Sequence, residues 1–475
     1  MTSHRNDGKL PNIGGWSTPH PLHSAGYRVE RRIRSIAAAA LVAVLAFIGT
    51  AVGATWFEFN SLVKQHGVSI IPSGKTIATE EPIDPNAGKA ISFLLLGQDT
   101  RDGSGNAALS GSHNGEDTGS HQSDTAMVVQ ISADRSYINI VSIPRDSLVN
   151  VPSCQTSKGV IPAQYGVMFN SIFNTAWTEG NGLESAANCA VHAVNALTGL
   201  SLQQFIVVDF AGLRDMIDAI DGVDVCVPVD TKDSYTDLNL KRGLNHLNGT
   251  TATEYARMRH GTGTDGSDIM RTTRQQYLIK QLVNEARSKS LYTNTSQIYQ
   301  LGKSALKSLN LSSGLADVST LVGLTLSLKN IDTSHVYART IPVEAAPSDP
   351  NRVVWSSDAD AVWTKMRENK ALTDESTSSA GASASATASA SASASASASA
   401  SSSSSSSDSS TSNSQQTPDP KTGLIKRSDG TLIDPNTGGI VDAQTGTITD
   451  ANTGQYIGIA DRYLNATVCA VTAQK

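Results

Sequence analysis

Aromatic and charged residues are both scarce in this chain of 475 residues, at 5% and 17% of the sequence. The net charge of −6 argues against a nucleic-acid partner, because proteins that bind nucleic acids in general are basic. The four cysteines form no CxxC pair and no His/Cys cluster at zinc spacing, so we expect no zinc site. The sequence also lacks a Gly-x-Ser-x-Gly motif, which argues against a serine hydrolase of that type.

An uncharged apolar stretch, IAAAALVAVLAFIGTAVGATWF (36–57), is long enough to cross a bilayer as a helix. Four arginines precede it in YRVERRIRS (27–35), which places residues 1–35 in the cytoplasm and the rest of the chain outside. A cleaved signal peptide remains the alternative, since small residues occupy 51–54. We therefore expect a single-pass protein of the cell membrane, with a polar stalk at 58–88.

The four cysteines suit an exported chain, because thiols oxidise outside the cell. Cys154 and Cys189 flank one predicted loop-and-helix unit, and a disulfide between them is expected. Cys226 lies in the apolar run VDVCVP, where it is either a buried thiol or a partner for Cys469. Spacing alone leaves that choice open.

Alternating apolar runs and helical patterns predict an α/β domain over 89–370, with a central mixed sheet covered by helices on both faces. Strands are expected at 91–97, 126–132, 137–144, 205–210, 223–228 and 335–343. Helices are expected at 183–198, at 211–222, from 272 onward and at 358–368.

The composition changes beyond this domain. Residues 371–417 are dominated by Ser and Ala, which cannot bury a core and predict a disordered linker. The tail at 418–475 repeats a turn motif as DPKTG, DPNTG, DAQTG and DANTG, separated by short strand-like pieces. This tail is either a small stack of β-hairpins, with wall binding as one possible role, or a weakly ordered extension.

Charged residues collect next to the predicted strands. The stretch EYARMRHGTGTDGSDIMRTTRQQYL (254–278) holds four arginines, and the stretches GQDTR, SDT and SIPRD add Asp99, Arg101, Asp124 and Arg145. Ligands of open α/β sheets bind at strand ends, and an arginine fork suits two phosphate oxygens at once. The pattern therefore predicts a phosphate or pyrophosphate site, with Asp99 and Asp124 as ligands for a hard divalent cation.

These motifs, with VVDFAGLRDMIDAIDGVDVCVP between them, resemble the LytR-CpsA-Psr family in order and spacing over roughly residues 90–285. The resemblance implies an extracytoplasmic, magnesium-dependent enzyme of a Gram-positive or actinobacterial envelope. Such enzymes transfer a glycopolymer from a polyprenyl-pyrophosphate carrier to peptidoglycan through a phosphodiester, and they hold the lipid in an apolar tunnel. Two departures are a long loop at 102–122 and Met168, which stands where the family has a lysine.

Carried over to this sequence, the resemblance implies that Asp99 and Asp124 bind magnesium. Asp268 and Arg271, in the family's Asp-x-x-Arg pattern, are implied to act in catalysis together with Arg145. Contacts with the pyrophosphate are implied for seven residues: Arg101, Arg145, Arg257, Arg259, Arg271, Arg274 and Gln275. The proton acceptor is either Asp268 or Asp124.

Two other functions fit the same sequence. A polyprenyl-pyrophosphate phosphatase or pyrophosphatase would use the same residues, with water as the acceptor. A non-catalytic, wall-binding regulator would depend instead on the Ser-rich segment and the repeat tail.

Overall fold

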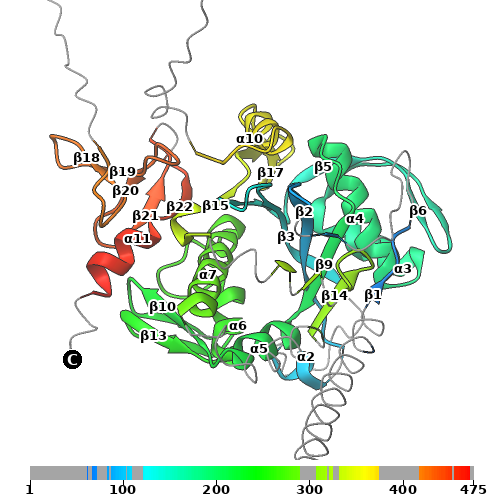
Figure 1. The fold of residues 1–475 in the computed structure, drawn as a ribbon, viewed down its shortest axis with the longest axis horizontal. Coiled ribbons are helices and arrows are strands. Elements are labelled where there is room, and N and C mark those ends of the chain that lie inside the picture. The colour runs from blue at the N-terminus through cyan, green and yellow to red at the C-terminus, as the bar shows by residue number, and fades with distance from the viewer. Residues whose placement is uncertain are drawn as a thin grey trace, which may run out of the picture. The chain divides into compact units, whose positions relative to one another are not determined.

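Seven strands pair into one mixed sheet, shown in Figure 1. The pairs β2–β3, β3–β4 and β9–β14 are antiparallel, whereas β2–β9, β4–β15 and β1–β14 are parallel. This arrangement confirms the predicted mixed α/β sheet. The strands, in spatial order, are β1 (Gly67–Val68), β14 (Leu309–Ser312), β9 (Gln204–Asp209), β2 (Ile91–Asp99), β3 (Gln122–Ile131), β4 (Ile138–Ile143) and β15 (Val336–Thr340).

The structure is a computed structural model, which describes residues 61, 67–71, 83–84, 87–102, 104–109, 121–288, 306, 308–317, 320–321, 323–324, 331–373, 417–451 and 454–470. Within these ranges no helix is both long and apolar enough to span a membrane. The predicted cytoplasmic segment at 1–35 and the predicted anchor at 36–57 lie outside the described residues, as does nearly all of the predicted linker.

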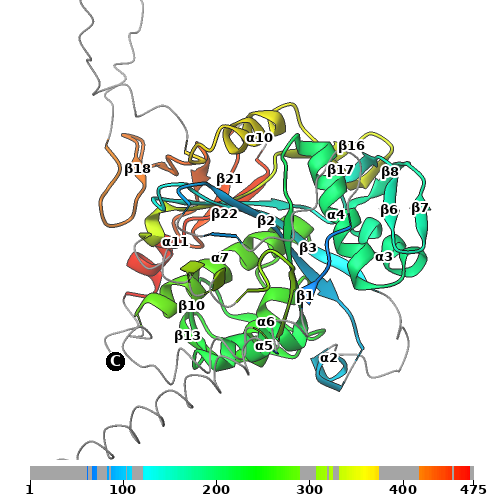
Figure 2. The same ribbon diagram turned by 45° about the vertical axis from the view of Figure 1, so that its right-hand side comes forward.

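Alternate side chains of the central strands bury against different helices. Leu94, Leu96 and Val128 pack with α3 (Phe169–Gly180), α4 (Leu183–Thr198) and α10 (Ala359–Arg367). Leu95, Met127 and Val129 point to the opposite face, where the long helix α7 (Asp268–Ser288) lies (Figure 2). This alternation is the expected consequence of the two-residue period of a strand. Helices therefore cover both faces of the sheet, as predicted.

Two further helices join α7 on its face of the sheet. Helix α5 (Phe210–Ala219) starts where the Asp209 side chain accepts a hydrogen bond from the Gly212 amide at 2.7 Å. Helix α6 (Gly249–Arg257) is capped in the same way by Asn248. A polar oxygen at this position satisfies an amide that the first helical turn leaves unpaired. The short helix α2 (Ser104–Leu109) contacts α5 and lies in the long loop noted in the sequence.

Small hairpins complete this part of the chain. The pairs are β5 (Leu148–Val151) with β8 (Gln164–Met168), β6 (Cys154–Thr156) with β7 (Gly159–Ile161), β10 (Val223–Val227) with β13 (Gly243–Leu247), β11 (Thr231–Asp233) with β12 (Leu238–Leu240), and β16 (Val343–Ala346) with β17 (Asp349–Trp355). The predicted disulfide joins Cys154 to Cys189 and so ties β6 to α4.

Part of the predicted stalk belongs to the folded unit. Strand β1 pairs with β14 at one end of the central sheet. The Ile71 amide donates to the side-chain oxygen of Asn188 at 2.9 Å, and the Ile83 amide donates to the Gly314 carbonyl. Both contacts attach the segment before residue 89 to the domain.

The repeat tail folds as a five-stranded antiparallel meander: β18 (Ile425–Lys426), β19 (Leu432–Ile433), β20 (Ile440–Val441), β21 (Thr447–Thr449) and β22 (Tyr456–Ile459). Its motif explains its turns. In the second repeat, Asp434 accepts from the amide and the hydroxyl of Thr437, and Gly438 adopts a φ of 68°. Glycine tolerates this left-handed conformation, which other residues rarely adopt. The structure thus favours the hairpin stack over a weakly ordered tail.

The meander packs against α7 instead of standing apart. Cys469 forms a disulfide with Cys226, which settles the pairing that the sequence left open. Leu464 is buried with Tyr277 in one apolar cluster, and Lys280 pairs with Asp461 at 3.2 Å. These contacts make the tail part of the compact unit formed by residues 62–475.

Replacing both Cys226 and Cys469 with serine should lower the free energy of unfolding by about 2–4 kcal/mol, because the disulfide closes a long loop of the unfolded chain. Thermal unfolding of the full chain measures this effect. The pair Cys154→Ser and Cys189→Ser is the matched control, since it closes a much shorter loop of 35 residues and leaves the tail attached. An unchanged melting temperature in the first variant would contradict the stabilising role.

Candidate functional site

A cavity of about 770 Å³ lies on the α7 face of the central sheet. The sheet contributes Leu95 and Met127 to its wall. The two helices that close it supply most of the remaining apolar side chains: Leu213, Met216 and Ile217 from α5, Ile220 directly after it, and Leu278, Ile279, Leu282 and Val283 from α7. Such a space takes an elongated apolar ligand, because burying apolar surface is favourable.

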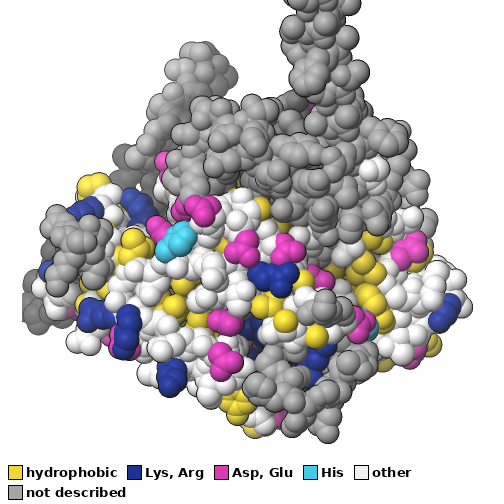
Figure 3. Space-filling view, turned by 90° about the horizontal axis from the view of Figure 1, so that it is seen from below, with side chains coloured by type: hydrophobic (Ala, Val, Ile, Leu, Met, Phe, Trp, Pro, Cys, Tyr) yellow, Lys and Arg dark blue, Asp and Glu magenta, His cyan; other side chains and the backbone are white. Residues whose placement is uncertain are grey.

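Polar side chains line the same cavity at the ends of several elements. Asp99 is the last residue of β2, Asp124 lies in β3, and Arg257 is the last residue of α6. The site residues predicted from sequence that line the cavity are Asp99, Arg101, Asp124, Arg145, Arg257, Arg259, Arg271 and Gln275. On the face drawn in Figure 3, the described basic and acidic side chains are interspersed. Five arginines, in contrast, line the one cavity.

A buried ion cluster orders this polar region. Asp124 Oδ2 accepts from Arg145 Nη1 at 2.7 Å and from Arg271 Nη1 at 3.0 Å. Arg271 Nη2 in turn donates to Asp268 Oδ1 at 2.5 Å, and the Arg145 amide donates to Asp268 Oδ2 at 3.1 Å. Arg271 is only 4% exposed. Because charge-assisted hydrogen bonds are strong and directional, the cluster fixes both guanidinium groups.

The two predicted metal ligands differ in their electrostatics. Burial by itself would raise the pKa of Asp124, but Arg271 and Arg145 outweigh it and hold that pKa below its ordinary value. Burial, together with the charge of Asp124, raises the pKa of Asp99 despite the opposing effect of Arg257. Asp124 therefore stays ionised readily, whereas an ionised Asp99 needs additional positive charge nearby.

The arginines have unused capacity to bind an anion. The buried Nε atoms of Arg145, Arg259 and Arg271 lack a hydrogen-bond partner. Burial lowers the pKa of Arg259, and the neighbouring positive charges of Arg145 and Arg271 lower it further. A bound phosphate group would accept from these donors and relieve the repulsion between the guanidinium groups.

A divalent cation fits the carboxylates. Asp124 Oδ1 is buried without a hydrogen-bond partner, although Oδ2 of the same group has two. Such an oxygen, beside an Asp99 whose ionisation is disfavoured, suits a hard cation that also takes phosphate oxygens. In the part of the chain that the structure describes, no three His, Cys, Asp or Glu side chains gather as a metal site. Protein groups would thus supply only part of the coordination.

Two predicted residues do not line the cavity. Asp268 is buried behind it and acts on Arg271 and Arg145 through the contacts above. Arg274 points elsewhere and donates to the Met258 carbonyl, where its pKa is lowered by burial. Its side chain joins α7 to the end of α6.

Three aromatic residues at the cavity escaped the sequence analysis. Phe210 lies beneath Arg257, whose guanidinium carbon is 4.2 Å from the ring centre. Tyr235 and His260 also line the cavity, with ring centres 5.1 Å apart, and Tyr235 is 71% exposed. No motif contains Tyr235, and His260 was given no role although it lies in the stretch 254–278, because the loops that carry the two rings meet only in the folded chain. Phe210 follows directly after β9, a position at which its proximity to a strand-end site could have been inferred.

Comparison with known proteins places this geometry in context. "Cell wall biosynthesis protein LcpA" of Corynebacterium glutamicum is 28% identical over 265 residues, which cover 54% of this chain and 50% of LcpA. "Polyisoprenyl-teichoic acid--peptidoglycan teichoic acid transferase TagT" of Bacillus subtilis is 25% identical over 302 residues, or 62% of this chain and 82% of TagT. The chain therefore spans about half the length of the first of these relatives.

Among solved structures, TagV of Bacillus subtilis aligns with 59% of this chain and 97% of its own, at 21% identity and a TM-score of 0.44. A family model described as the "LytR_cpsA_psr family" matches residues 58–371, which is more than half of the chain. The match includes the segment with β1 as well as the cavity and its arginines. The chain belongs to the LytR-CpsA-Psr family.

Proposed function

We propose that the protein is a phosphotransferase that moves a glycopolymer from a polyprenyl-pyrophosphate carrier to peptidoglycan. The observation that carries this proposal is a single cavity that has both an apolar wall and a polar region with five arginines. A ligand that matches both parts has a long hydrocarbon chain and an anionic head. TagT, a relative at 25% identity, is named a polyisoprenyl-teichoic acid–peptidoglycan teichoic acid transferase, which supports the same class.

In this reaction a hydroxyl of the acceptor sugar attacks the phosphorus that carries the glycan. A new P–O bond forms to the acceptor, the bond to the second phosphate breaks, and polyprenyl phosphate leaves with the electron pair. The hydroxyl proton passes to a base. Arg145, Arg259 and Arg271 stabilise the charge that develops on the phosphate oxygens, and the contacts with Asp124 orient Arg145 and Arg271 before the substrate binds.

Asp124 and Asp99 would hold a magnesium ion, which supplies charge neutralisation and a template for the phosphate oxygens when it is bound. Between the two candidate proton acceptors, Asp124 lines the cavity and Asp268 does not. Both oxygens of Asp268 already accept from Arg271 and Arg145. We therefore assign Asp268 a positioning role. Asp124 Oδ2 accepts from Arg145 and Arg271 and its Oδ1 would face the cation, so neither aspartate is assigned as the base.

The proposal includes a location. With the apolar stretch at 36–57 as the anchor, the cavity stands on the outer side of the membrane, where both the carrier lipid and peptidoglycan are found. The two disulfides suit that compartment.

Arg259→Ala should weaken binding of polyprenyl pyrophosphate and lower transfer about 10²-fold, because it removes a donor from the phosphate site and breaks no side-chain hydrogen bond or ion pair among the described residues. Arg271→Lys should have a larger effect, since lysine cannot bridge Asp124 and Asp268. Mass spectrometry of lipid that co-purifies with the full chain, together with detection of the glycan–peptidoglycan phosphodiester, measures both steps.

Arg367→Lys is the matched control, because Arg367 pairs with Asp360 on the surface and does not line the cavity. Equal lipid content in wild type and in Arg259→Ala would contradict the assignment of the arginines. Lipid binding with release of inorganic phosphate, and without the phosphodiester, would identify a phosphatase instead.

The pKa of Asp99 is raised and that of Asp124 is lowered, so replacing each residue with asparagine should change the melting temperature in opposite directions when a chelator is present. At neutral pH, Asp99→Asn should raise the melting temperature, because ionised Asp99 is disfavoured in the folded state; the gain should vanish as pH falls below the ordinary value of 3.8. Asp124→Asn should lower it at neutral pH, and that loss should shrink as pH falls through the lowered pKa. Thermal unfolding from about pH 3 to pH 8 tests both. Shifts of the same sign would contradict the assignment.

Magnesium should raise the melting temperature of the chelator-treated chain, as a ligand of the folded state does, and Asp124→Asn should abolish this rise. Asp360→Asn is the control, since Asp360 pairs with Arg367 away from the cavity. A rise of equal size in both variants would place the magnesium elsewhere.

A further inference from the structure

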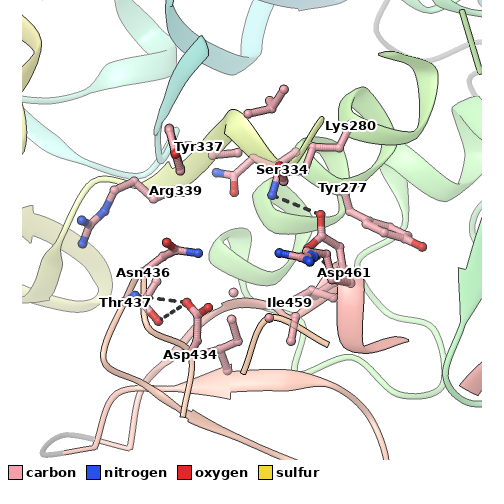
Figure 4. A pocket seen from close by; sticks show the side chains of 18 of the residues that line it. Tyr277, Lys280, Ser334, Tyr337, Arg339, Asp434, Asn436, Thr437, Ile459 and Asp461 are labelled. Atoms are coloured by element: carbon pink, nitrogen blue, oxygen red, sulfur yellow. Dashed lines mark hydrogen bonds and ion pairs between the residues drawn. The ribbon is translucent and has the colours of Figure 1, made fainter. Parts of the chain in front are cut away.

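A second cavity, of about 590 Å³, lies between the repeat tail and the central domain (Figure 4). In Figure 4, Tyr337 and Arg339 of β15 stand above the opening, and Asp434, Asn436 and Thr437 of the tail stand below it. Neither the family motifs nor the proposed transfer reaction accounts for this space. It exists because the meander folds back onto the domain.

Helix α7 separates the two cavities. Gln275, Leu278 and Leu282 face the arginine-lined cavity, whereas Tyr277, Lys280 and Asn284 line the second one. Residues spaced by three, four or seven positions share a helix face, so these two sets lie on different sides of α7. The second cavity is therefore a separate site and not an extension of the first.

The lining of the second cavity is polar and nearly balanced in charge, with basic and acidic side chains in nearly equal number. Lys280 and Asp461 neutralise each other at 3.2 Å, and Asp434 accepts from the Thr437 hydroxyl at 2.7 Å. The lining holds one more basic than acidic side chain, which is little attraction for a polyanion, and it mixes polar groups with apolar ones such as Leu424, Ile448 and Ile459. An uncharged ligand rich in hydroxyl and amide groups fits this surface.

The ring of Tyr337 supplies an apolar face between these polar groups. It is half-buried on β15, opposite the tail, and lines the cavity. A sugar ring offers C–H groups on its faces and hydroxyl groups at its edge. A tyrosine ring with planar amide and carboxylate side chains nearby can contact both parts of such a ring.

A disulfide and an ion pair fix the tail side and the domain side of the cavity relative to each other before any ligand binds. The Cys226–Cys469 disulfide and the Lys280–Asp461 ion pair attach the end of the meander to β10 and α7. Asp434, near the middle of the meander, is 8% exposed. A site built on fixed elements loses less entropy when a ligand binds.

We propose that this cavity binds a saccharide chain whose sugars carry hydroxyl and acetamido groups. That the natural ligand is a glycan strand of the wall rests on the proposed function; the binding itself does not. The tail would then hold the enzyme on its acceptor polymer, with the reacting groups on the other side of α7.

The test is calorimetric titration of the full chain, in detergent, with the tetramer of N-acetylglucosamine. Asn436→Ala and Tyr337→Ala remove one contact from each wall and should each weaken binding about fivefold to tenfold. Gln444→Ala is the matched control: Gln444 occupies the same turn position in the next repeat, but it does not line the cavity. It should leave the affinity unchanged.

The Arg259→Ala variant should bind the tetramer as wild type does, which separates this proposal from the lipid site. Failure of lipid transfer with intact tetramer binding would overturn only the proposed function. Three results would overturn the saccharide site: no saturable binding to wild type, equal affinity in all three tail and β15 variants, or preferential binding of oligo(glycerol phosphate).

Discussion

The contact of Arg271 with Asp124 and Asp268 is the interaction on which the site depends. It joins the first turn of α7 to β3. Asp268 also accepts a hydrogen bond from the Arg145 amide, which links α7 to the chain after β4. A buried pair of this kind is costly to break, at about 3–5 kcal/mol, because the remaining partner keeps an uncompensated charge. The same bonds that orient the guanidinium groups of Arg271 and Arg145 therefore also hold α7 and the sheet together.

Two faces of helix α7 pack against different parts of the molecule. One face completes the apolar cavity with Leu278 and Leu282, and the other receives the meander through Tyr277 and Lys280. A tail that seemed separable in sequence is thus part of the support for the helix that carries Arg271. Substitutions in the meander that weaken its packing against α7 would therefore disturb the arginine cluster, although they lie outside that cluster.

Local patterns were sufficient to predict much of this architecture. Leucine and valine runs marked β2 and β3, and the motif residues Asp99, Arg101, Asp124 and Arg145 stand where those strands and β4 end, so their convergence on one cavity was predictable. Arg274 does not line the cavity, because a helix position one turn from Arg271 does not determine the direction of a long side chain. The packing of the tail was not predictable, since it depends on Cys469 meeting Cys226 across 243 residues.

That long covalent link changes what a cut in the chain would mean. The Ser/Ala-rich segment lies between Cys226 and Cys469, so it belongs to a closed loop of the covalent structure. Proteolysis within this segment would produce two polypeptides that remain joined, and the tail would leave only after reduction of the bond. Under oxidising conditions, the part of the second cavity that the tail forms would therefore stay attached after such a cleavage.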